Sequence, residues 1–167
     1  MPSLLESPWN NDETRPIIAI VEDNDEDFYA FVRAIRSQEA LRQMLSNYTF
    51  LRFHDGDEAL DYLMRGGNYE GLKAPLPIFI LLDLNLPGTD GREIIRQVKQ
   101  NPNLQILPMI VLTSSASPSD IQTCYRYGVN SYLLKPMGVS TMQQTVQTLF
   151  QYWFQFAVLP SYGQVPI

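Results

Sequence analysis

Five polar side chains suited to metal binding or phosphate chemistry stand directly after short apolar runs of this sequence. They are the carboxylates of Glu22, Asp23 and Asp83, the hydroxyl of Thr113 and the ammonium of Lys135. Three carboxylates held close together repel one another, and each raises the pKa values of the others. A hard divalent cation relieves that repulsion, and oxygen ligands with room for water suit Mg²⁺. If the five side chains converge, the sequence predicts a cation beside an anionic substrate, most simply a phosphoryl group.

Convergence depends on the elements that carry these residues. Short apolar runs, which favour strands, alternate with longer amphipathic stretches, which favour helices. Strands are expected at 17–21, 48–53, 78–82, 107–112 and 131–134, and helices near 25–45, 56–65, 90–100, 118–127 and 139–156. This alternation predicts a doubly wound α/β fold around a parallel sheet. Ligands of such sheets bind beyond the carboxyl ends of the strands, where all five polar residues are expected.

One domain is expected over residues 16–156, because 167 residues that are 45% hydrophobic can bury a core. Residues 1–15 and 157–167 are expected to be terminal extensions. The formal net charge of -6 and the scattered 12 Lys and Arg residues argue against a nucleic-acid-binding face. No apolar run approaches the roughly 20 residues that cross a bilayer, and the N-terminus does not look like a secretory signal. With Cys124 as its one cysteine, the chain is expected in the reducing cytoplasm and not in a membrane.

Four motifs carry a resemblance to a known family, the receiver domains of two-component response regulators. They are VEDN at 21–24, LLDLNLPGTDG at 81–91, LTSSA at 112–116 and SYLLKP at 131–136. The resemblance covers about residues 16–156. It implies a flavodoxin-like sheet of five parallel strands in the order 2-1-3-4-5, with five helices. It also implies a signalling protein that accepts a phosphoryl group from a histidine kinase and catalyses only its own phosphorylation and dephosphorylation.

The resemblance gives each motif position a role. Asp83 matches the phosphoacceptor aspartate of the family. Glu22 and Asp23 match the acidic pair that holds Mg²⁺ together with Asp83 and the main-chain carbonyl of Asn85. Many members of the family carry Asp where this chain has the longer Glu22.

Three further positions match residues that contact the phosphoryl group or change position when it is present. Thr113 and Lys135 match the residues that contact its oxygens, and Tyr132 matches the aromatic residue that moves with Thr113 in the switch. The bond between Lys135 and Pro136 is cis in the family, so a cis bond is expected here. The acyl phosphate that forms on the aspartate is labile, so the phosphorylation is temporary.

Three less specific sequence features resemble those of the response regulators paired with cyanobacterial phytochromes. They are the long connection RGGNYEGLKAPLP at 65–77, the run DLNLPGTDGRE and the aromatic FQYWF before a Leu-Pro. This resemblance implies a light-regulated histidine kinase as the upstream partner. From the residues alone, the 65–77 connection is either a plain surface loop or a partner-contacting loop.

The last predicted helix is unusually aromatic. Its apolar residues spread over roughly 200° of arc, about twice what packing on one side requires. It is either a core helix with the tail folded over it or, as we favour, an exposed apolar strip that joins a second copy of the protein. The interface candidates are Phe150, Trp153, Phe154 and Phe156.

Two other functional classes remain open at this point. A pseudo-receiver would have the same fold but never carry phosphate, although every polar motif position is filled here. A phosphohydrolase of the aspartyl-phosphate type needs an acid two residues after the nucleophile, where this chain has Asn85. His54 is the only histidine, so a His-based zinc site and an internal His-to-Asp relay are not expected. No segment after residue 156 is long enough for an output domain, so the expected output is protein contact.

Overall fold

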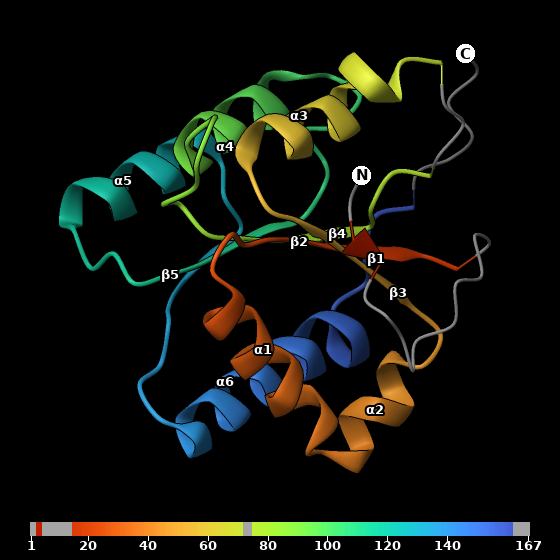
Figure 1. The fold of residues 1–167 in the computed structure, drawn as a ribbon, viewed down its shortest axis with the longest axis vertical. Helices are drawn as coiled ribbons and strands as arrows, with labels where there is room; N and C mark the ends of the chain where they lie inside the picture. The colour runs from red at the N-terminus through yellow and green to blue at the C-terminus, as the bar shows by residue number, and fades with distance from the viewer. Residues whose placement is uncertain (1–2, 5–14, 72–74, 162–167) are drawn as a thin grey trace.

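A sheet with helices on both faces forms the centre of the computed structural model, which describes residues 3–4, 15–71 and 75–161 (Figure 1). The strands are β1 (Ser3–Leu4), β2 (Ile17–Val21), β3 (Thr49–Phe53), β4 (Phe79–Leu82), β5 (Met109–Thr113) and β6 (Ser131–Leu134). They lie in the order β1-β3-β2-β4-β5-β6. The five strands from β2 to β6 are parallel, so the predicted order 2-1-3-4-5 is confirmed. The two-residue β1 pairs antiparallel with β3 and is an addition to the prediction.

The described residues form six helices, one more than predicted. They are α1 (Asp25–Arg36), α2 (Glu39–Leu45), α3 (Gly56–Met64), α4 (Gly91–Gln100), α5 (Pro118–Tyr127) and α6 (Val139–Gln151). The expected helix at 25–45 is broken because Ser37 and Gln38 both donate side-chain hydrogen bonds to the carbonyl of Ala34. Gln38 then takes an extended backbone from which α2 begins. Helices α1, α2 and α6 cover one face of the sheet, and α3, α4 and α5 cover the other (Figure 1).

Capping side chains fix the turns that lead from the strands into the helices. Asn24, Asp55 and Asp90 each accept a hydrogen bond from a backbone amide in the first turn of the next helix. Ser117 does the same for α5. Gly128 ends α5 in a left-handed conformation with φ 98°, which glycine adopts readily. These turns carry the candidate residues, so their geometry is set locally.

Two apolar clusters hold the layers together, one on each face of the sheet. Along β2, Ile18 and Ile20 face α1 and α6, whereas Ala19 and Val21 face α3 and α4. All five β2 residues are buried. A strand covered on both faces has to be apolar at every position, which explains its unbroken apolar run.

The position of Phe150 in α6 shows that one predicted interface residue is wrong. Phe150 is fully buried, with its ring centroid 5.9 Å from that of Phe31 and 6.4 Å from that of Phe79. It fills the space between α6 and the sheet, so Phe150 cannot meet a second copy. Trp153 and Phe154 are half-buried and also contact Phe79.

The chain beyond α6 makes one π-helical turn, Tyr152–Phe156, before it becomes extended. Of the four candidates, Phe156 alone is exposed, at 77% of its surface. Tyr152 and Val158 are exposed beside it along the chain, while Leu159 packs on the core. The segment therefore closes the core on one side and leaves an apolar strip exposed on the other, while its contact with a second copy stays a prediction.

The 65–77 connection packs on α3 where the structure describes it, and residues 72–74 lie outside the described part. A short 3-10 turn, Gly67–Tyr69, follows α3. The buried Tyr69 hydroxyl donates to Glu58 at 3.1 Å, and the Tyr62 hydroxyl donates to the carbonyl of Pro75 at 2.6 Å. Within the ranges described, no helix has both the length and the apolar character needed to cross a membrane.

Candidate functional site

Three carboxylates meet at the carboxyl edge of the sheet, where the parallel topology predicted them. Glu22 and Asp23 follow β2 and Asp83 follows β4, its direct neighbour in the sheet. One ligand oxygen from each lies within 4.8 Å of the other two. Glu22 and Asp83 are buried, whereas Asp23 is open to solvent. The predicted acidic cluster is therefore present, with one side accessible to water.

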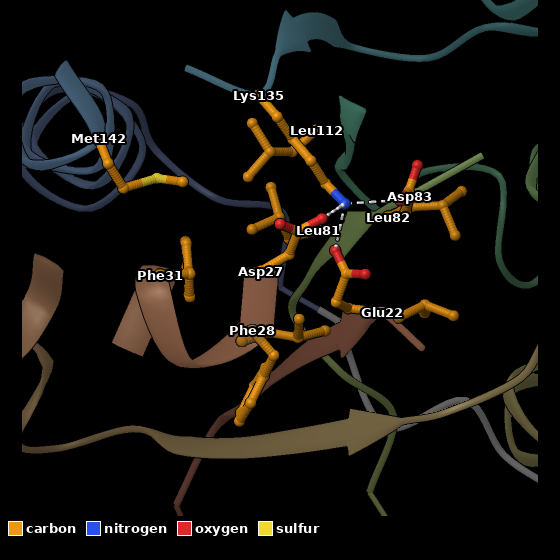
Figure 2. A pocket seen from close by; sticks show the side chains of 12 residues that line it. Glu22, Asp27, Phe28, Phe31, Leu81, Leu82, Asp83, Leu112, Lys135 and Met142 are labelled. Atoms are coloured by element: carbon orange, nitrogen blue, oxygen red, sulfur yellow. Dashed lines mark hydrogen bonds and ion pairs between the residues drawn. The ribbon is translucent and has the colours of Figure 1, made fainter. Parts of the chain in front are cut away.

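Lys135 supplies the positive charge of the site. Its Nζ lies 2.7 Å from a carboxylate oxygen of each of Glu22, Asp27 and Asp83. Figure 2 shows the ammonium between these three carboxylates. Burial alone would lower the pKa of Lys135, but the hydrogen bonds to the three acids outweigh it and raise that pKa. The lysine is therefore fully charged at neutral pH.

The two oxygens of Asp83 have different partners. Its Oδ1 accepts hydrogen bonds from the amides of Leu84 at 2.6 Å and Asn85 at 3.3 Å, while Oδ2 faces Lys135. The start of α4 closes over this turn so tightly that a Cβ at Gly91 would collide with the carbonyl oxygen of Asp83. The carboxylate is held in one orientation at the rim of a buried strand.

Glu22 is held from two sides. Its Oε1 accepts from the amide of Asn24 at 3.0 Å, and its Oε2 pairs with Lys135. Burial raises the pKa of Glu22 and the charge of Asp83 adds to that rise, while Lys135 opposes it. A proton therefore competes for this carboxylate at a higher pH than for an exposed glutamate.

Thr113 and Tyr132 lie on the neighbouring strands β5 and β6 and share a contact with Ser115. Thr113 is fully buried, and its Oγ1 accepts from the amide of Ser115 at 3.4 Å. The half-buried Tyr132 donates its hydroxyl to the carbonyl of Ser115 at 2.8 Å. The threonine and the tyrosine predicted to move together are thus connected through one loop residue.

The predicted cis bond before Pro136 is wrong. None of the peptide bonds between described residues is cis. The trans form is preferred by about 0.5–1 kcal/mol even before proline. With this trans bond, the amide of Lys135 donates to the carbonyl of Thr113 at 2.8 Å, and its side chain reaches the three acids.

Two residues near the site escaped the sequence analysis. Asp27 reaches Lys135 from the first turn of α1, but in the sequence it is one of three consecutive acids that favour a helix start. Asp27 comes four residues after Asp23, about one helical turn, and this spacing is the sequence feature that could have indicated Asp27 as a site residue. Arg52 is buried on β3 and contacts the turn after β2. A lone arginine within an apolar strand gave no sign of that contact.

These side chains fit a hard divalent cation. Three carboxylates, from Glu22, Asp27 and Asp83, share the ammonium of Lys135, and the carboxylate of Asp23 lies beside those of Glu22 and Asp83. Crowded acids repel one another unless further positive charge joins them. The donors are all oxygens and Asp23 faces solvent, which suits an ion that keeps part of its water shell.

Known proteins share both the sequence and the fold of this chain. Residues 18–147 match the response regulator receiver domain. Response regulator Rcp1 of Synechocystis sp. is 36% identical over 153 residues, which cover 90% of this chain and 99% of Rcp1. A probable methanogenesis regulatory protein, FilR2 of Methanothrix harundinacea, is 39% identical over 137 residues, which cover 82% of this chain and 83% of FilR2.

Solved structures agree with these relatives. The phosphorylated cyanobacterial phytochrome response regulator RcpA superposes with a TM-score of 0.78 at 34% identity, over 89% of this chain and 100% of RcpA. The Mn²⁺-bound form of Rcp1 superposes with a TM-score of 0.77 at 33% identity, over 87% of this chain and 99% of Rcp1. Fold, motifs and site geometry thus agree, and the chain belongs to the response regulator receiver family, whose members are signalling proteins.

Proposed function

We propose that Asp83 accepts a phosphoryl group from a histidine kinase and that the protein then signals through altered protein contacts. The observation that carries this proposal is the orientation of Asp83: backbone amides hold Oδ1, and Oδ2 lies 2.7 Å from the ammonium of Lys135. A carboxylate fixed beside a cation is placed to attack an anionic phosphoryl donor.

The transfer needs no proton from Asp83. One carboxylate oxygen attacks the phosphorus of a phosphohistidine, an O–P bond forms, and the N–P bond breaks with its electron pair leaving on the imidazole. Lys135 neutralises charge on the transferring oxygens, and the hydroxyl of Thr113 donates a hydrogen bond to one of them. Catalysis is then mainly positioning and electrostatics.

Mg²⁺ is the cation that we propose for this site. The ligands would be Glu22, Asp23, Asp83 and the main-chain carbonyl of Asn85. When bound, the ion neutralises negative charge that develops on the transferring phosphoryl group. The Mn²⁺-bound form of Rcp1 supports a divalent ion in this fold, and the all-oxygen donor set favours Mg²⁺.

The phosphoryl group adds about -1.5 to -2 charges at neutral pH. We propose that Thr113 moves toward the new oxygens and that Tyr132 then leaves Ser115 for the space that opens. This change would alter the surface formed by α5, β6 and α6. Partner proteins would recognise that surface, in the cytoplasm and without contact with nucleic acid or membrane.

The experiment that tests this function is phosphorylation by a small acyl-phosphate donor with Mg²⁺, followed by intact-mass measurement. We expect one added phosphoryl group on the natural protein and none on Asp83→Asn. Asp61→Asn removes an exposed carboxylate of α3 and serves as the matched control. Mg²⁺-dependent labelling of Asp83→Asn would contradict the proposal, and an unlabelled natural protein would favour a pseudo-receiver.

We propose a phytochrome-type histidine kinase as the upstream partner. RcpA, which this chain resembles, is described as a phytochrome response regulator, whereas FilR2 is described as a regulator of methanogenesis. The same mass assay can decide between kinases. Light-dependent phosphotransfer from a phytochrome kinase, faster than from a kinase without a photoreceptor, is the supporting result; equal rates contradict it.

We also propose that the protein forms a homodimer through its C-terminal segment. The exposed side chains of Tyr152, Phe156 and Val158 make up the apolar strip, and Tyr152 also lines a groove between β6 and α6. The same strip on a second copy can cover it across a two-fold axis.

A further inference from the structure

Arg52 is a buried charge in a strand that is otherwise apolar around it. Its exposed fraction is 4%, and its neighbours Leu51 and Phe53 are buried in the core. Side chains alternate along a strand, so Arg52 lies on the same face as Phe50, toward α1. It pairs with Ile20 one residue before the end of β2. From there a long side chain can extend past the end of β2.

The guanidinium of Arg52 contacts only the turn that carries the acidic pair and the first turn of α1, among the contacts that the described residues show. Its Nε donates to the carbonyl of Glu22 at 3.0 Å, and its Nη2 donates to the carbonyl of Asp23 at 3.3 Å. Its Nη1 pairs with Asp25 at 2.8 Å. The guanidinium carbon also lies 4.1 Å from the ring centroid of Phe28.

Stability alone gives a weak reason for an arginine at this position. Removing a guanidinium from water is costly, and hydrogen bonds and an ion pair offset that cost only in part. An apolar side chain of similar volume in a core is often neutral or stabilising by comparison. The planar fork does what an apolar residue cannot, because it holds two consecutive carbonyls and a carboxylate at once.

We infer that Arg52 is a positioning residue of the cation site. It holds the main chain of Glu22 and Asp23 and thereby sets the direction in which both carboxylates leave the backbone. Mg²⁺ demands near-ideal octahedral geometry, so ligands that move apart bind it less tightly. Outer contacts that orient metal ligands typically change metal affinity by about 10- to 100-fold. This inference rests on the proposed function of the site.

Charge and positioning predict opposite effects for Arg52. As a positive charge near the acids, the guanidinium repels Mg²⁺, and its removal would tighten cation binding. As a clamp on the turn, it aligns the ligands, and its removal would weaken cation binding. The sign of the change therefore identifies which role dominates.

The experiment is calorimetric titration of the unphosphorylated protein with Mg²⁺. For Arg52→Met we expect a dissociation constant about tenfold higher than that of the natural protein. Arg52→Lys keeps the charge but offers a single ammonium in place of the fork, so an intermediate increase is expected. Equal or tighter Mg²⁺ binding by Arg52→Met would overturn the inference.

Phe50→Leu is the matched control, because it disturbs the same face of β3 two residues before Arg52, where Phe50 pairs with Ile18. Its Mg²⁺ affinity should equal that of the natural protein even if its melting temperature falls. If Phe50→Leu loses affinity as Arg52→Met does, the effect is general destabilisation and the inference fails. A natural protein that neither binds Mg²⁺ nor accepts phosphate would instead contradict the proposed function.

Discussion

At the scale of single residues, the site was predictable where function follows from position at a strand end. Glu22, Asp83 and Lys135 lie close together because parallel strands bring their carboxyl ends to one edge. Asp27 and Arg52 were missed because their contacts depend on side-chain direction across elements. A sequence pattern shows which face a residue lies on, but not which neighbouring turn a long side chain reaches.

Asp27 is the residue whose effect on the chemistry is easiest to isolate. Its carboxylate shares Lys135 with Asp83 and so competes with an incoming phosphoryl group for the ammonium. A unit charge several ångströms away near a protein surface interacts with energies on the order of 1–3 kcal/mol. We therefore expect Asp27→Asn to speed phosphorylation by a small donor roughly fivefold or more. Rate constants from intact-mass time courses measure this change.

Glu26→Gln provides the control for Asp27. It removes one negative charge from the same turn of α1, and its side chain is exposed. We expect a much smaller rate increase, which salt should remove because exposed charges are screened. A slower reaction of Asp27→Asn would instead mean that Asp27 orients Lys135 for catalysis.

At the scale of elements, the unbroken apolar strands and the capped helices were predictable, and the exceptions have local causes. The break between α1 and α2 depends on two polar side chains that both bond one carbonyl. The strand β1 is too short for a periodic pattern. The helix break and the short strand both depend on hydrogen bonds, which hydrophobic periodicity does not reveal.

An ion pair between helices holds the loop that joins Thr113 to α5. Arg92 of α4 donates to both oxygens of Asp120, at 2.9 and 2.7 Å. Asp120 also accepts from the Ser115 hydroxyl at 2.6 Å, and Ser115 accepts from Tyr132. The hydrogen bond from Arg92 holds the pKa of Asp120 below its usual value. In the unphosphorylated protein, this chain of contacts keeps the loop beside Tyr132.

Arg92→Ala should loosen that loop without unfolding the domain. Hydrogen bonds to charged groups contribute about 1.5–3 kcal/mol, so the local opening should become roughly tenfold more frequent. Amide hydrogen exchange at Ser115 and Ser117 measures the change, since both amides donate within this loop. Arg96→Ala, which breaks a pair within α4 itself, should leave those amides unchanged. Equal exchange in both variants would show that Arg92 does not hold the loop.

At the scale of the whole molecule, the two faces of the C-terminal segment have different roles. Phe150 closes the core between α1, α6 and the sheet, and Phe154 contacts Tyr48 at a centroid distance of 4.9 Å. The sequence could not separate these residues from exposed Phe156, because all belong to one apolar spread. Phe154 and Phe156 both lie in the π-helical turn Tyr152–Phe156, but Phe154 packs against Tyr48 and Phe79 whereas Phe156 is exposed.

The assembly state tests the exposed side of this segment. Full burial of a Phe or Val side chain contributes about 1.5–3 kcal/mol, so Phe156→Ser with Val158→Ser should weaken a dimer by roughly 100-fold or more. Sedimentation across a range of concentrations, with and without a phosphodonor, measures that change.

Phe150→Ser is unsuitable as a control for the dimer because it would open the core. Tyr29→Ser removes another exposed aromatic side chain, from α1, and should leave the dimer intact. A natural protein that stays monomeric at every concentration, phosphorylated or not, would mean that the proposed dimer does not form.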